Sequence, residues 1–213
     1  MKIKSLAIAT LVASLTAGAA TTVVAQELSN WIGVSVGKTN FSNGSNTANP
    51  GSNTLSGISA GSSENSDSAW KIYLGLPVTK YLGLELGYAK LGDQTISGTF
   101  PVLGASSSRA TSTAYLIDLI GNYDFNENFS LLGKVGIHRW GVNDDTTKGA
   151  VSATNGADGF DFTYGLGAQY NVNKDIGIRM ELERINNMGH EGTTGKIDAN
   201  LITIGVVYKF KIL

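Results

Sequence analysis

Two sets of residues in this sequence have types and spacings that could support chemistry. The first is Gly33-Val34-Ser35-Val36-Gly37, which matches the G-x-S-x-G pattern of serine nucleophiles, with His138 and His190 as the available bases. That pattern needs a strand-to-helix turn, whereas residues 30–41 alternate in polarity and no helical pattern follows them. We expect His138 at the rim of a strand and His190 in a loop, and neither has partners at metal-ligand spacing. The sequence therefore predicts no catalytic residue, metal or cofactor.

The second set consists of charged residues that alternate with apolar ones, so that in a strand they share the face opposite the apolar side chains. Because burying a lone charge is costly, charges enclosed by strands must pair with one another. We expect Arg179 to form the central pair with Glu85 or Glu181, and Asp161 and Lys209 also lie at inward positions. The predicted charge network comprises Lys71, Glu85, Asp118, Lys134, Arg179, Glu181 and Glu183.

The elements that must position these charges are eight segments of about ten alternating residues, near the length of a tilted strand that crosses a bilayer. In residues 159–172, for example, Phe160, Phe162 and Tyr164 alternate with Asp161 and Thr163. The predicted strands are 30–41, 69–78, 82–92, 112–125, 129–142, 159–172, 176–185 and 197–210.

Short and long connections alternate strictly between these segments. The short ones are 79–80, 126–128 and 173–175, and the long ones are 42–68, 93–111, 143–158 and 186–196. Outer-membrane barrels have this pattern, with tight periplasmic turns and long outer loops. The turn residues Lys80, Glu127 and Lys174 follow one another at intervals of 47, which indicates a repeated hairpin module. We therefore predict an all-β fold, an eight-stranded antiparallel up-and-down transmembrane β-barrel.

Aromatic residues gather near the ends of the predicted strands, as expected for the two girdles at the membrane interfaces. The predicted interface aromatics are Trp70, Tyr81, Tyr123, Phe125, Phe129, Trp140 and Tyr170, and Phe41 is expected with them. The last strand has Thr203, Gly205, Tyr208 and Phe210 in an order that resembles the C-terminal assembly signal of bacterial outer-membrane barrels, followed by three further residues. This strand is expected to close the barrel against the first one.

Composition agrees with an exported membrane barrel and excludes several other classes. The 213 residues contain 16 basic and 17 acidic side chains, so no strong field favours nucleic acid, and the absence of cysteine excludes disulfides and thiolate sites. Residues 1–25 have the charged start, apolar run and small-residue end of a cleaved signal peptide. We expect residues 26–213 to form the barrel domain.

Residues 81–92, YLGLELGYAKLG, and 162–185, FTYGLGAQYNVNKDIGIRMELERI, resemble strands of the OmpA transmembrane domain. The resemblance covers essentially the whole mature chain and implies a lumen plugged by ion pairs, as in the small barrels of the OmpX kind. The peptidoglycan-binding domain of OmpA is not expected here.

The resulting prediction is a structural barrel in the Gram-negative outer membrane whose long outer loops contact an unknown extracellular partner. Its expected partners are outer membrane lipids, lipopolysaccharide and the barrel assembly machinery, but not nucleic acid. The alternatives are an enzyme that modifies lipid A and a narrow pore of low conductance.

Overall fold

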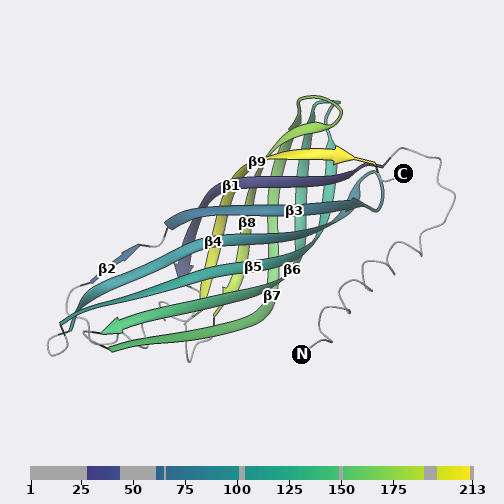
Figure 1. Ribbon diagram of the computed structural model, residues 1–213. Coiled ribbons are helices and arrows are strands. Elements are labelled where there is room, and N and C mark those ends of the chain that lie inside the picture. The colour runs from purple at the N-terminus through teal and green to yellow at the C-terminus, as the bar shows by residue number, and fades with distance from the viewer. Residues whose placement is uncertain are drawn as a thin grey trace.

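The computed structural model describes residues 28–43, 61–64, 66–100, 104–148, 151–189 and 196–211. These residues form nine strands, and none of their segments is a helix long and apolar enough to cross a membrane (Figure 1). The strands are β1 (Asn30–Asn43), β2 (Gly61–Glu64), β3 (Ser66–Pro77), β4 (Leu82–Phe100), β5 (Gly104–Asp124), β6 (Phe129–Lys148), β7 (Val151–Asn171), β8 (Ile176–Met188) and β9 (Ile197–Phe210).

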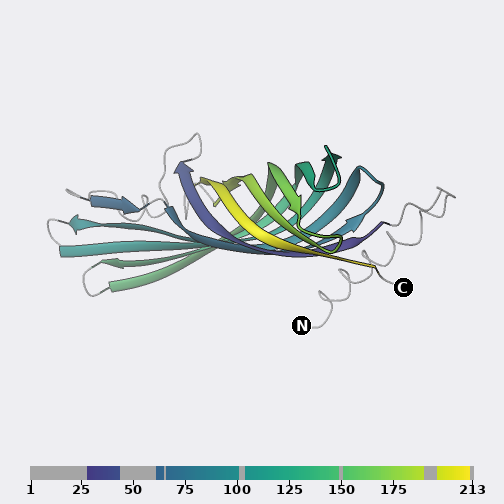
Figure 2. The same ribbon diagram turned by 90° about the horizontal axis from the view of Figure 1, so that it is seen from above.

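Eight of these strands close into an antiparallel barrel. β1 pairs with β3 on one side and with β9 on the other, and the circuit is completed through β8, β7, β6, β5 and β4. The seam between β1 and β9 runs along both strands, from Asn30 opposite Phe210 to Asn43 opposite Ile197 (Figure 2). The short β2 adds to β4 where β3 no longer covers it. The predicted fold class and all eight predicted strands are confirmed.

The two faces of each strand differ in the way that the alternating sequence predicts. On β9, Ile202, Ile204, Val206 and Tyr208 are exposed, whereas Leu201, Thr203 and Val207 are buried. On β7, Leu166 is 69% exposed, although it is a large apolar residue. Every barrel strand presents such an apolar outer face, while many polar side chains are buried inside. An apolar outer band around a polar interior is the arrangement of a membrane barrel.

The short turns share one local structure. Asn126 Oδ1 accepts hydrogen bonds from the backbone N–H groups two and three residues later, at 2.9 and 2.8 Å. Asn173 Oδ1 does the same at 2.9 and 2.8 Å, and Thr79 Oγ1 at 3.2 and 3.0 Å. A side-chain oxygen that binds N–H groups just ahead of it stabilises a tight turn. The 47-residue spacing of the turns therefore reflects a hairpin that is built three times in the same way.

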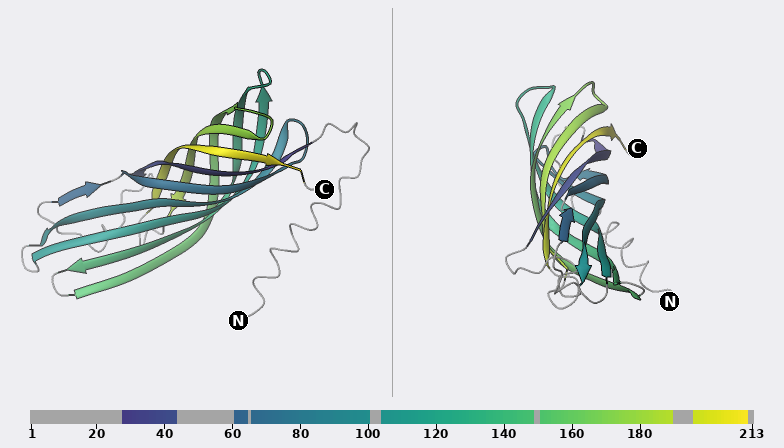
Figure 3. Two further views of the ribbon diagram at one scale, coloured as in Figure 1. Left: turned by 45° about the horizontal axis from the view of Figure 1, so that its top comes forward. Right: turned by 90° about the vertical axis from the view of Figure 1, so that its left-hand side faces the viewer.

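Two of the predicted long loops are largely strand, which corrects the sequence analysis. Within 93–111, β4 continues to Phe100 and β5 begins at Gly104, and within 143–158, β6 continues to Lys148 and β7 begins at Val151. These paired ends project beyond β1, β8 and β9 (Figures 1 and 3). Continued pairing satisfies the backbone N–H and C=O groups of the hairpins, although their side chains are mostly polar. Most of the first predicted loop, residues 44–60, lies outside the described residues.

Aromatic side chains lie exposed on the outer wall near both ends. Tyr123 and Phe125 near the short turns pack edge to face at 5.1 Å, and Tyr88 packs between Trp70 and Tyr115 toward the other end. Trp140 and Phe41 do not join these bands, because both are buried in the interior. The exposed outer-wall aromatics include Tyr81, Tyr123, Phe125, Phe129, Tyr170 and Tyr208 at one end and Trp70, Tyr115 and Phe160 at the other.

An apolar cluster fills the interior near the long connections. Phe41, Leu91 and Trp140 belong to it, together with Ile185 and Met188 at the end of β8. Trp140 lies two residues before the inward-facing Val142 on β6, and side chains two residues apart in a strand point to the same side. We call this odd or even position the parity of a residue. Parity, and not closeness to the strand end, therefore decides the direction of Trp140.

The outer position of Leu166 leads to a test of sidedness. We expect Leu166→Arg to lower the stability of the folded barrel by about 2–4 kcal/mol, because the guanidinium would enter the bilayer near its midplane. The control is Ser152→Arg on the projecting part of the same strand, which should have little effect. Urea unfolding of the variants in lipid vesicles measures both, and equal losses would contradict the assignment of the lipid-facing side.

The aromatic pair at the end of β9 leads to a test of barrel closure. Tyr208 and Phe210 stack with ring centroids 6.4 Å apart on the strand that closes the barrel. We expect Phe210→Ala to reduce the folded fraction in the outer membrane, and Phe162→Ala, an exposed aromatic on β7, to reduce it less. The readout is the different migration of unheated and boiled protein on a denaturing gel. A larger loss for Phe162→Ala would refute a special role for the closing strand.

Candidate functional site

The interior brings together six charged side chains from four strands. β3 contributes Lys71, β4 contributes Glu85, and β6 contributes Lys134. β8 contributes Arg179, Glu181 and Glu183, which are two residues apart and therefore share its inward face. All six are at most 4% exposed, and we call them the charge network.

Lys134 lies at the centre of the charge network. Its Nζ is 2.9 Å from Glu85 Oε1, 2.7 Å from Glu181 Oε1 and 3.0 Å from Glu183 Oε1. Lys71 contacts the other oxygens of two of these carboxylates, with Nζ 2.5 Å from Glu181 Oε2 and in direct contact with Glu183 Oε2. Three carboxylates thus share two ammonium groups.

Arg179 completes the charge network. Its Nη1 donates to Glu85 Oε2 at 2.8 Å, while the nearest Glu181 oxygen is 3.9 Å away. Of the two partners considered from the sequence, Glu85 therefore makes the closer contact. Three cations balance three carboxylates, and this balance reduces the cost of burying them.

Two aromatic residues surround these charges, and neither was among the predicted site residues. Trp31 Nε1 donates to Glu85 Oε2 at 3.0 Å. The Tyr73 ring centroid lies 5.0 Å from Lys71 Nζ and 5.1 Å from Arg179 Cζ, within the range of cation–π attraction. Their inward direction could have been predicted from the sequence, because Tyr73 has the same parity as Lys71 along β3. Trp31 likewise has the same parity as the inward-facing Ser35 along β1.

The glycines of the G-x-S-x-G segment serve packing. A Cβ on Gly33 would lie 2.2 Å from the Tyr73 ring, and a Cβ on Gly37 would lie 1.8 Å from the carbonyl oxygen of Ile202 on β9. Ser35 between them is buried inside a continuous strand. The motif thus provides space for an interior ring and for the β1–β9 seam.

Three other predicted inward charges lie outside the charge network. Asp118 is buried, but its Oδ1 has no hydrogen-bond partner among the described residues. Asp161 Oδ1 accepts a hydrogen bond from the next backbone N–H. Lys209 Nζ donates to Asn171 Oδ1 at 3.0 Å, near the short turns.

The histidine expected at the rim has a different position. His138 is 1% exposed and lies inside the barrel, since it shares the inward parity of Lys134 and Trp140 on β6. In the described part of the chain, no serine or other hydroxyl makes a hydrogen bond to its ring. His190 lies outside the described residues. Among the described residues, no three His, Cys, Asp or Glu side chains are arranged so that they could hold a metal ion.

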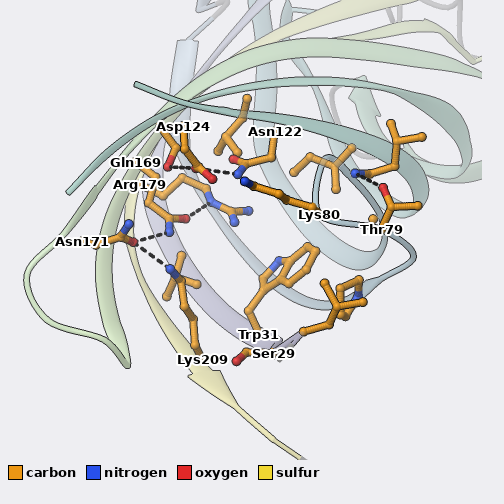
Figure 4. Close-up of a pocket in the computed structure, with 18 of the residues that line it drawn as sticks. Ser29, Trp31, Thr79, Lys80, Asn122, Asp124, Gln169, Asn171, Arg179 and Lys209 are labelled. Atoms are coloured by element: carbon orange, nitrogen blue, oxygen red, sulfur yellow. Dashed lines mark hydrogen bonds between the residues drawn. The ribbon is translucent and has the colours of Figure 1, made fainter. Parts of the chain in front are cut away.

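A polar cavity of about 560 Å³ opens beside the charge network, at the short-turn end (Figure 4). Arg179, Trp31 and Lys209 lie along it, and Lys80 extends into it from the first short turn (Figure 4). We call it the vestibule. It ends at Arg179, where the charge network begins, so polar space reaches the charged interior from this end.

Comparisons with known proteins agree with this architecture. A family model described as the outer membrane protein β-barrel domain matches residues 7–210. Outer membrane protein A of Klebsiella aerogenes is 30% identical over 138 residues, which cover 64% of this chain and 37% of the relative. Outer membrane protein A of Escherichia coli O157:H7 is 26% identical over 137 residues, 64% and 37% of the two chains. The match spans less than two fifths of the length of these curated relatives. The family model and these relatives together confirm the predicted OmpA-like resemblance.

Solved structures share the fold at low identity. AlkL in lipid bilayers is 18% identical with a TM-score of 0.57, over 90% of this chain and 95% of AlkL. Ail of Yersinia pestis is 13% identical with a TM-score of 0.51, over 85% and 98%. The Neisserial surface protein NspA is 12% identical with a TM-score of 0.51, over 85% and 97%. At these identities the likeness concerns the fold alone.

Proposed function

Because the chain belongs to the outer membrane protein β-barrel domain family, we propose that it is a plugged structural barrel that presents its outer hairpins to a partner outside the cell. The outer membrane is its location, and its apolar wall contacts the lipids there. We include four features in this proposal: the plug, the outer partner, recognition by the assembly machinery through the last strand, and removal of residues 1–25.

The observation that supports the plug is the balanced charge network. Six side chains from four strands occupy the lumen with their charges paired, and an apolar cluster lies toward the long-connection end. An eight-stranded barrel is about filled by its own side chains. Moving a hydrated ion through would require separating buried ion pairs, which is unfavourable.

The projecting ends of β4 to β7 support the role at the surface. They extend the wall beyond the other strands (Figure 1) and carry exposed polar side chains such as Asp145 and Thr154, whose Oγ1 donates a hydrogen bond to Asp145 Oδ1 at 2.7 Å. Ail of Yersinia pestis, the attachment invasion locus protein, has the same fold. Because Ail is only 13% identical to this chain, we base the surface role on the projecting hairpins and not on that likeness.

This role can be tested by comparing three kinds of cells. The first lack the protein, the second contain it, and the third contain a variant in which residues 144–155 are replaced by a short turn. We expect loss of the protein to increase sensitivity to detergent, and the shortened variant to restore the barrier without restoring attachment to surfaces. If the shortened variant attaches as well as the wild type, the β6–β7 hairpin does not contact the partner.

The enzymatic alternative makes a different prediction. A lipid A-modifying enzyme would change the mass spectrum of lipid A between cells with and without the protein, and a structural barrel would leave it unchanged. The buried position of His138 and the packing role of residues 33–37 favour the structural barrel. A reproducible mass difference that requires His138 or His190 would overturn this preference.

A further inference from the structure

The lining of the vestibule contains more cations than carboxylates. Its lining includes two carboxylates, Asp124 and Glu127. Asp124 Oδ1 already accepts hydrogen bonds from Asn122 Nδ2 at 2.8 Å and Ser130 Oγ at 2.6 Å. The four cations of the lining are Lys80, Lys174, Arg179 and Lys209.

The cations of the vestibule are only partly neutralised. Lys80, Lys174 and Lys209 form no ion pair with a carboxylate in the described part of the chain, and Lys209 contacts the neutral Asn171. Arg179 uses Nη1 for Glu85 and Nε for Gln169, at 2.8 and 2.9 Å. Its guanidinium has a further amino group, Nη2, that neither of these bonds uses, and Arg179, although only 4% exposed, belongs to the lining of the vestibule.

The vestibule also has an apolar wall. Trp31 lies within it beside Arg179 (Figure 4). The lining also includes Ile120, Leu132 and Val207. A volume of about 560 Å³ exceeds the space that a bare inorganic anion needs and lies in the range of small-molecule sites. The combination of cations with an aromatic wall suits an anion that has an organic body.

We propose that the vestibule binds a small organic anion, such as a phosphate ester or a carboxylate, with its acidic group between Lys209 and Arg179 and its body against Trp31. Charge-assisted hydrogen bonds to these two groups would hold the anion. Short turns face the periplasm in barrels of this kind, so the ligand enters from the periplasm. It is free in solution, because a headgroup fixed in the bilayer cannot reach Arg179 inside the wall.

This site is independent of the surface role proposed above. It requires the folded barrel, but it lies at the opposite end from the projecting hairpins and involves no extracellular partner. Failure of anion binding would leave the surface role intact, and failure of surface attachment would leave the vestibule intact.

The test uses isotopically labelled, folded protein in maltoside micelles, which contain no phosphate headgroups. Inorganic phosphate and phenyl phosphate are titrated at constant ionic strength, with sodium chloride as the reference, and the backbone amide signals are followed by NMR. We expect saturable shifts at Asn171 and Lys209, and tighter binding of phenyl phosphate than of inorganic phosphate.

Variants distinguish a specific binding site from nonspecific attraction of anions to lysine side chains. Lys209→Met should weaken phenyl phosphate binding by about tenfold, the loss expected for one charge-assisted hydrogen bond. Lys38→Met, an exposed lysine toward the other end of β1, should leave it unchanged, and Lys80→Met provides a second test if Lys209→Met does not fold. Absence of saturation, or equal affinity in the wild type and both vestibule variants, would overturn the proposal.

Discussion

Replacing Lys134 with Met is expected to lower the free energy of unfolding of the barrel by about 3–5 kcal/mol, as for other broken buried ion pairs. Lys134 Nζ lies within 3.0 Å of oxygens from Glu85, Glu181 and Glu183, so the change removes the central cation from three buried carboxylates. Lys71 and Arg179 would remain to balance them. Urea unfolding in lipid vesicles measures the loss.

The matched control is Lys174→Met, which removes an exposed lysine from a short turn and should change stability little. Combining Lys134→Met with Glu183→Gln should recover part of the loss, because it removes one of the stranded carboxylates. A Lys134→Met barrel as stable as the Lys174→Met barrel would show that the interior carboxylates are solvated, and the plug would not exist as described.

Arg179→Met should also destabilise the barrel by about 3–5 kcal/mol, since it removes the cation that contacts Glu85 Oε2 and leaves three buried carboxylates with two cations. The geometry further predicts unequal coupling. Arg179 Nη1 is 2.8 Å from Glu85 but 3.9 Å from Glu181, so a double-mutant cycle with Glu85→Gln should give a larger interaction energy than one with Glu181→Gln.

Strict additivity in the Glu85 cycle would mean that Arg179 and Glu85 are not paired in the membrane. A larger coupling with Glu181 would contradict the order of the two distances. Either result would require a different arrangement around Arg179, whereas additivity in the Glu181 cycle alone would agree with the structure.

Parity along the strands explains how much could be predicted from the sequence. A strand directs successive side chains to opposite sides, so the inward positions of Lys71, Glu85 and Arg179 follow once the apolar face is known. The same rule places Trp140 and His138 inside, and both were misplaced because proximity to a strand end was given more weight than parity.

The pairing of individual charges could not be derived in the same way. Lys71, Glu85, Lys134 and Glu183 lie on four strands, and their contacts depend on the stagger of the closed barrel, which alternation does not encode. The strand ends were underestimated for another reason. The bilayer sets a minimum strand length, but Ser- and Thr-rich hairpins such as β4–β5 and β6–β7 continue to pair in water.

The closed interior is tested most directly by recording ionic current across planar bilayers that contain the purified, folded wild-type protein. Insertion is verified in the same preparation by the different migration of unheated and boiled protein. The paired charge network predicts a current that stays at the baseline of the lipid alone. Reproducible conductance steps from the wild-type protein would contradict the plug and establish the barrel as a pore.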